Sequence, residues 1–151
     1  MTHQALDLRM NFFRSRCAER SLAMTHQRWV IYRTLAATSQ HPTPEETFAQ
    51  VRQEIPSISL ATIYKNIKTF LDAGLLREVS TPDQTMRLDA NLESHHHLVC
   101  ASCGTILDLS EDCVAPVHLK KTPPRGFRVE SYNVSFLGHC GQCMPQAEAS
   151  S

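Results

Sequence analysis

This 151-residue sequence has no long apolar run. A helix that crosses a bilayer needs about 18 consecutive apolar residues, and no stretch approaches that length. The N-terminus also lacks the succession of charged, apolar and small residues that marks a secretory signal. We therefore expect a cytoplasmic protein without membrane association.

The sequence also lacks the motifs of common hydrolases. No H-E-x-x-H arrangement accompanies the histidines and no nucleophile–base constellation is visible, so a metallohydrolase or any other enzyme is disfavoured. The formal net charge is +0, which argues against nonspecific binding of nucleic acid. However, residues 1–80 carry an excess of Lys and Arg, whereas residues 81–151 carry an excess of Asp and Glu. This division suits DNA contact in the first half and cation binding in the second.

The first half of the chain has the pattern of helices followed by a hairpin. The spacing of apolar residues predicts four helices, at about residues 10–20, 25–35, 43–55 and 59–73. Thr43 and Glu46 form a capping box at the start of the third helix, and Gly74 ends the fourth. Two short strands follow, at residues 75–79 and 85–88. This order is typical of a winged helix.

The second half has the pattern of strands. We expect strands at residues 95–101, 105–109 and 127–137, with one helix at about residues 112–121. The predicted fold class is α+β, with an N-terminal winged-helix domain and a C-terminal α/β domain. The predicted domain limits are residues 1–86 for DNA binding, 87–92 for a hinge, 93–144 for the second domain, and 145–151 for a disordered tail.

Four of the six cysteines form two C-x-x-C pairs: Cys100 with Cys103, and Cys140 with Cys143. Each such turn brings two sulfurs to about 2.3 Å from one ion, so two turns complete a closed, structural zinc site. Two redox pairs or a disulfide framework are the alternative, but in a reducing cytoplasm such pairs more often bind metal. Cys17 and Cys113 have no partner pattern, and we expect both to be buried.

A second group of candidate ligands precedes the first cysteine pair. His95, His96 and His97 lie in a predicted strand, where alternation places His95 and His97 on one face and His96 on the other. Asp108 on the next strand can return to the same neighbourhood. The alternative is that this histidine run is a solvated surface feature. His41 and Asp89 lie in other segments, and no pattern joins them to this group.

Three segments in this order resemble the ferric-uptake-regulator family of bacterial repressors: residues 59–66 (SLATIYKN), residues 95–104 (HHHLVCASCG) and residues 138–143 (GHCGQC). The likeness covers nearly the whole chain, from Thr25 to Cys143. It implies a dimeric winged-helix repressor whose residues 93–144 form an α/β dimerisation and metal-binding domain with the structural four-cysteine zinc site. It also implies a regulatory metal between the two domains. Carried over position by position, it gives this ligand set: His41, Asp89, His95, His97 and Asp108.

This ligand set of three imidazoles and two carboxylates suits Fe(II) or Mn(II) better than a thiolate site would. A metal that bridges the two domains would fix the angle between them, and hence the distance between the two recognition helices of a dimer. Iron-sensing members of the family usually carry Glu in place of Asp108, and often a histidine where Tyr132 aligns. Zinc-sensing members place a cysteine near Asp89. The sequence therefore resembles the peroxide-sensing subgroup most.

The implied mechanism is oxidation of the ligands. Fe(II) at the site would reduce peroxide, and oxidation of His41 or His95 would release the metal and end repression. Mn(II) would give a peroxide-resistant repressor. The alternatives are an iron-sensing repressor of the same fold and a zinc-knuckle interaction module without DNA binding. The order of helices and hairpin counts against the second alternative.

For DNA binding, the helix over residues 59–73 is expected to enter the major groove. We expect Tyr64 and Thr62 to contact thymine methyl groups, and Lys65 and Arg28 to contact phosphates. Ser59, at the start of the helix, completes this candidate set. A dimer implies a two-fold operator, an inverted repeat whose AT-rich character comes from the resemblance alone.

Overall fold

The computed structural model describes residues 3–130 and 132–144. The chain divides into two compact units, Met1–Leu92 and Glu93–Ser151. Residues 87–92, predicted as a hinge, belong to the first unit, and the predicted disordered tail at residues 145–151 lies outside the described residues. None of the helices in the described ranges is long and apolar enough to cross a membrane.

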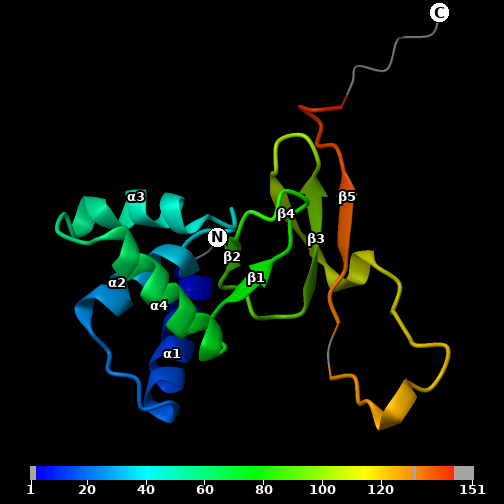
Figure 1. Cartoon of the computed structure of the whole chain (residues 1–151), viewed down its shortest axis with the longest axis horizontal. Coiled ribbons are helices and arrows are strands. Elements are labelled where there is room, and N and C mark those ends of the chain that lie inside the picture. Colours follow the sequence, from blue (N-terminus) through cyan, green and yellow to red (C-terminus); the bar gives the residue numbers. More distant parts are fainter. Residues whose placement is uncertain (1–2, 131, 145–151) are drawn as a thin grey trace, which may run out of the picture. The chain divides into compact units, whose positions relative to one another are not determined.

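The first unit consists of four helices and a two-stranded antiparallel sheet (Figure 1). The helices are α1 (His3–Glu19), α2 (His26–Ala36), α3 (Pro44–Glu54) and α4 (Leu60–Asp72). The strands are β1 (Arg77–Val79) and β2 (Arg87–Asp89). The predicted order of helices followed by a hairpin is confirmed.

The helix ends are set by local hydrogen bonds. The Thr25 side chain accepts from the N–H of Arg28 at the start of α2. In α3 the capping box is complete, because Thr43 accepts from the Glu46 N–H while the Glu46 carboxylate accepts from the Thr43 N–H. Gly74 follows α4 with φ +68°, a conformation that glycine adopts without steric cost.

An aromatic cluster joins three helices in the core of the first unit. Phe13 of α1 stacks on Tyr32 of α2, with ring centroids 4.4 Å apart, and both rings meet the edge or face of Phe70 from α4. All three side chains are fully buried. Burial raises the pKa of Tyr32 to about 12, so the phenol stays neutral in the core.

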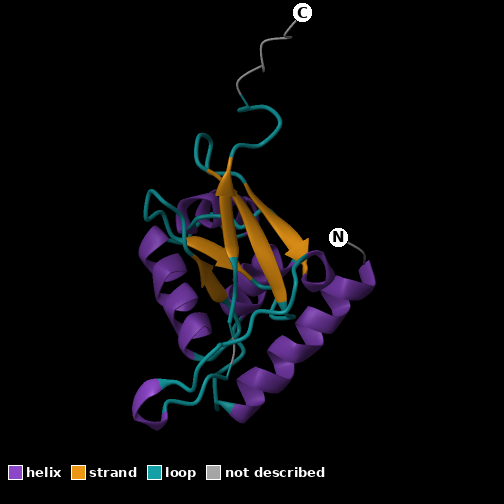
Figure 2. Ribbon diagram, turned by 90° about the vertical axis from the view of Figure 1, so that its right-hand side faces the viewer, coloured by secondary structure: helices purple, strands orange, loops and turns teal. Residues whose placement is uncertain are grey.

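The second unit contains a three-stranded sheet in the order β4-β3-β5, whose strands are orange in Figure 2. The strands are β3 (His95–Cys100), β4 (Ile106–Ser110) and β5 (Ser135–Gly138). β3 pairs with β4 antiparallel and with β5 parallel. Two short 3₁₀ turns, η1 (Glu111–Cys113) and η2 (Pro124–Gly126), lie in the long connection from β4 to β5.

Three expectations for this unit were wrong. The predicted helix at residues 112–121 is absent apart from η1, since Pro116 removes a hydrogen-bond donor and clashes with the preceding helical turn. The predicted strand at residues 127–137 begins only at Ser135. The His97 N–H donates to the Val134 carbonyl at 3.0 Å, and the parallel register of β3, which starts at His95, leaves no partner for residues before Asn133. Cys113 is exposed, whereas Cys17 is buried as expected.

The aromatic cluster predicts that Phe13 carries much of the stability of the first unit. Phe13→Ala should lower the free energy of unfolding by about 3–5 kcal/mol, because it removes a fully buried ring and leaves a cavity. Phe12 on the same helix is 37% exposed, and the Arg16 guanidinium lies over its ring. Phe12→Ala should therefore lower the free energy of unfolding by under about 1 kcal/mol. Denaturant titration would measure both, and equal losses would contradict the assignment.

Candidate metal centres and DNA-reading surface

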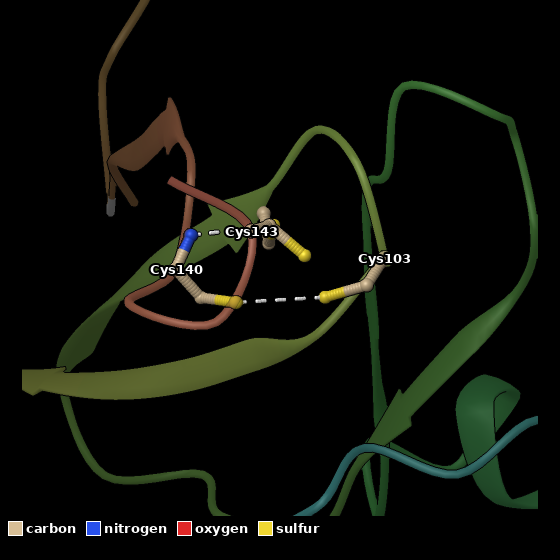
Figure 3. Close-up of side chains that lie close together, drawn as sticks. Cys103, Cys140 and Cys143 are labelled. Carbon is tan, nitrogen blue, oxygen red and sulfur yellow. Dashed lines mark hydrogen bonds between the residues drawn. The ribbon is translucent and has the colours of Figure 1, made fainter. Parts of the chain in front are cut away.

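Four cysteines meet at one end of the sheet in the second unit. Cys100 ends β3, Cys103 lies in the turn to β4, and Cys140 and Cys143 follow β5. Because β3 lies between β4 and β5, the two turns come together, and the four sulfurs all lie within 4.8 Å of one another. Figure 3 shows Cys103 and Cys140 pointing toward each other. Their sulfurs are 3.7 Å apart.

Backbone and hydroxyl groups around Cys100 and Cys103 favour the thiolate form that binds metal. The Cys140 N–H donates to the Cys100 Sγ at 3.3 Å, and this bond with that of the Cys103 N–H lowers the pKa of Cys100 to about 5. The Thr105 hydroxyl, 3.1 Å from the Cys103 Sγ, lowers the pKa of Cys103. Contacts with the sulfurs of Cys103 and Cys140 instead raise the pKa of Cys143 to about 12.

The cluster fits Zn²⁺ better than it fits disulfides. A sulfur–sulfur separation of 3.7 Å far exceeds the roughly 2.05 Å of a bond, and the four sulfurs form one group instead of two separate pairs. Four thiolates around one point are the donor set of a closed tetrahedral zinc site.

On one face of the same sheet, His95, His97 and Asp108 come together. His97 faces Asp108 in the β3–β4 register, and the Nε2 atoms of His95 and His97 are 3.0 Å apart. The Asp108 Oδ1 lies 3.7 Å from the His95 Nε2 and 3.9 Å from the His97 Nε2. The carbonyl oxygen of Glu93 lies 2.9 Å from the His95 Nδ1, which places a proton on Nδ1 and leaves Nε2 for a metal.

His96 lies on the opposite face, as the alternation predicted. Its ring stacks on Tyr132 with centroids 6.0 Å apart and an interplanar angle of 25°. The Tyr132 hydroxyl accepts a hydrogen bond from the Val117 N–H at 3.3 Å. Tyr132 is therefore a packing residue that ties the β4–β5 connection to the sheet.

The first unit contains a second pair of candidate ligands, His41 and Asp89. His41 lies in the loop between α2 and α3, and Asp89 ends β2. The His41 Nε2 is 4.0 Å from the Asp89 Oδ1, and both side chains are buried. The Asp89 Oδ1 also accepts from the Asn91 N–H at 2.7 Å, which orients the carboxylate. No local sequence signal links the two residues, and only the family resemblance pointed to them.

The candidate DNA contacts fall into two groups. Lys65 and Tyr64 are exposed on α4, and the Tyr64 hydroxyl donates to the Glu45 Oε1 at 2.5 Å. Glu45 was not among the predicted residues, and its pKa is lowered chiefly by this hydrogen bond.

The other three candidates are Ser59, Thr62 and Arg28, and all of them form hydrogen bonds within the first unit. Ser59 caps α4 by accepting from the Thr62 N–H, and its hydroxyl lies 2.9 Å from the Thr62 hydroxyl. The Arg28 guanidinium donates to the Ala23 carbonyl at 2.7 Å and to the Asn66 Oδ1 at 3.3 Å.

Comparison with known proteins gives consistent matches. The model of the Ferric uptake regulator family matches residues 19–137. The peroxide-responsive repressor of Staphylococcus aureus (strain Mu50 / ATCC 700699) is 31% identical over 122 residues, which cover 81% of this chain and 82% of that protein.

Solved structures agree with this match. The peroxide stress regulator of Campylobacter jejuni is 27% identical with a TM-score of 0.63, covering 89% of this chain and 98% of that one. A zinc-bound manganese uptake regulator is 26% identical with a TM-score of 0.62, covering 84% and 97% of the two chains.

The cysteine cluster generates a test of the zinc site. Cys143→Ser should abolish bound zinc and unfold the second unit, because a closed zinc site contributes folding energy directly. The matched control is Cys113→Ser, which removes an exposed cysteine of the same unit outside the cluster and should keep the metal. Metal analysis by mass spectrometry and circular dichroism would measure both. A folded, zinc-free Cys143→Ser protein would refute the structural role.

Proposed function

This chain belongs to the ferric uptake regulator family, and from that membership we propose that it is a metal-dependent, DNA-binding transcriptional repressor that responds to peroxide. The observation that carries the choice of signal is Asp108, whose short carboxylate faces His97 and lies close to His95. The similarity to peroxide regulators of Staphylococcus aureus and Campylobacter jejuni supports the same choice.

We propose that one Fe(II) or Mn(II) ion takes ligands from both units. One half of the proposed site consists of His95, His97 and Asp108, and the other half consists of His41 and Asp89. Within each half, every ligand atom lies within 4.0 Å of another ligand atom of that half. Imidazole nitrogens and carboxylate oxygens suit these ions, whereas the four thiolates suit zinc. A metal that needs both halves would fix the arrangement of the two units and so permit DNA binding.

The response to peroxide would be stoichiometric. A bound Fe(II) ion would activate peroxide at this site. In the net reaction the ligand imidazole would be the two-electron reductant, so that it gains one peroxide oxygen at a C–H bond while the other oxygen leaves as water. His41 and His95 are the proposed targets. An oxidised imidazole holds the metal less well, so the two halves separate and DNA is released. Each molecule reacts once and is not a catalyst.

An exposed apolar face on the sheet of the second unit supports a homodimer. Leu98 of β3 pairs with Leu107 of β4 on one side and with Phe136 of β5 on the other. Their exposed fractions are 39%, 53% and 42%. Contiguous apolar patches of this kind mark protein interfaces. A two-fold dimer would present two α4 helices to an inverted-repeat, AT-rich operator in the cytoplasm, where the chromosome lies.

The proposed signal is tested by Asp108→Glu. The added methylene displaces the carboxylate by about one carbon–carbon bond without changing the number of ligands. We expect Fe(II)-dependent operator binding to survive and peroxide sensitivity to fall, whereas Asp108→Ala should lose metal affinity and operator binding together. Fluorescence anisotropy with labelled operator, before and after a fixed exposure to peroxide, would measure this.

The wild-type protein is the reference in this experiment. If it keeps its DNA after peroxide, the peroxide proposal fails and an iron-sensing repressor takes its place. If Asp108→Glu responds as fast as the wild type, the choice of Asp108 as the determinant of the signal is wrong. Mass spectrometry should find one added oxygen atom on a peptide that contains His41 or His95.

The surface of α4 gives a test of DNA reading. Tyr64→Ala should weaken operator binding by about 1–3 kcal/mol and reduce the preference over random DNA, because an exposed aromatic ring is removed from the groove-facing helix. Lys65→Ala should weaken operator and random DNA alike and flatten the salt dependence. Titrations at several salt concentrations would separate these effects. Equal losses of Tyr64→Ala on both DNAs would mean that Tyr64 does not read bases.

A further inference from the structure

The backbone of His41 has an unfavourable conformation. Its φ is +51°, in the left-handed region, and the next residue is Pro42. A residue with a side chain rarely adopts this region, and a following proline further disfavours helical values and favours an extended backbone. Such a conformation persists only where the surrounding structure holds it. The His41 side chain would point elsewhere if the loop relaxed.

Strand β2 supplies the contacts that hold this loop. The Leu88 N–H donates to the Pro42 carbonyl at 3.1 Å. The Arg87 guanidinium lies 3.5 Å from the His41 carbonyl oxygen and donates to the Glu46 Oε2 at 3.2 Å. Three bonds from two consecutive residues thus fasten residues 41–46 to the strand.

Glu46 connects the same contacts to a helix. Its Oε2 accepts from both Arg87 and the Thr43 N–H, the latter at 2.8 Å, and its own N–H donates to the Thr43 hydroxyl at 3.1 Å. The capping box of α3 and the loop that carries His41 therefore share one carboxylate oxygen.

The strand that holds His41 also carries Asp89. Arg87 and Asp89 are two residues apart, so they lie on the same side of β2. Strand β2 therefore carries the candidate ligand Asp89 itself and positions the other, His41, through Arg87. Neither metal ligation nor the capping box by itself requires an arginine at this position.

We propose that Arg87, acting with Glu46, is a positioning residue that holds His41 ready for metal binding and links that binding to the first turn of α3. This inference rests on the proposed metal site, because His41 and Asp89 are its ligands in the first unit. Arg87 does not touch the metal in this scheme. It keeps the strained loop in the conformation in which His41 lies beside Asp89.

We expect the Arg87–Glu46 ion pair to contribute little to the stability of the fold. The Arg87 side chain is 20% exposed and that of Glu46 is 54% exposed, and ion pairs with this degree of solvent contact contribute little to folding. A matched control exists in the same unit. Arg33 of α2 pairs with Glu54 at the opposite end of α3, with side-chain exposures of 33% and 41%.

The experiment compares Arg87→Gln with Arg33→Gln in zinc-loaded, full-length protein. Mn²⁺ is the probe because it avoids oxidation of the ligands, and its free concentration is followed by electron paramagnetic resonance. We expect Arg87→Gln to bind Mn²⁺ about 10-fold more weakly than the wild type, as is typical when a partner that orients a ligand is lost. Arg33→Gln should match the wild type, and the metal-free thermal midpoints of both variants should be alike.

Glu46→Gln tests the shared carboxylate. Glutamine keeps an oxygen for the capping box but loses the charge that attracts Arg87, so it should weaken Mn²⁺ binding in the same direction. The double variant should bind Mn²⁺ no more weakly than Arg87→Gln does, because both substitutions remove the same contact, the Arg87–Glu46 ion pair. Additive losses, or equal affinities of Arg87→Gln and Arg33→Gln, would overturn the proposal.

Amide exchange distinguishes the link to α3 from a general loss of structure. Mn²⁺ should protect the amides of residues 43–47 in the wild type and in Arg33→Gln, and should fail to do so in Arg87→Gln at equal metal occupancy. Protection that is the same in all three would overturn the link. If Mn²⁺ binding by the wild type is unchanged by His41→Ala, the proposed metal site itself fails, and that outcome is separate from the behaviour of Arg87.

Discussion

The register of β3 against its two neighbours determines both clusters of candidate metal ligands in the second unit. The N-terminal end of β3 carries His95 and His97 on one face, and pairing with β4 places Asp108 opposite His97. The C-terminal end carries Cys100, and pairing with β5 brings Cys140 toward it. A slip of one residue would exchange the two faces of the strand and disperse the imidazoles and the carboxylate.

The two clusters are separated by the chemistry of their donors as well as by position. Thiolates with N–H donors around them favour a soft, tightly held ion, and the low pKa of Cys100 favours metal over proton there. Imidazoles with a carboxylate favour a harder ion that exchanges more easily. One sheet can therefore carry candidate ligands for a tightly held structural ion at one end and for a more easily exchanged regulatory ion at the other, because the two donor sets prefer different metals.

Features that depend on local sequence were predictable, and those that depend on distant pairing were not. The capping box of Thr43 and Glu46 and the glycine after α4 follow from hydrogen bonds within one turn, and the structure has both. The extent of β5 depends on its pairing with β3, which no local pattern of residues 127–137 reveals. Arg87 meets Glu46 only because a hairpin folds back on a helix start, 41 residues away along the chain.

The connection between the two cysteine turns has a consequence for how the second unit folds. Cys103 and Cys140 are 37 residues apart, whereas β3 and β4 are joined by a tight turn. The hairpin of β3 and β4 needs only a short loop, whereas β5 must close a long loop at an entropic cost before it can pair. One ion bound by all four sulfurs would close that loop and so hold β5 beside the hairpin.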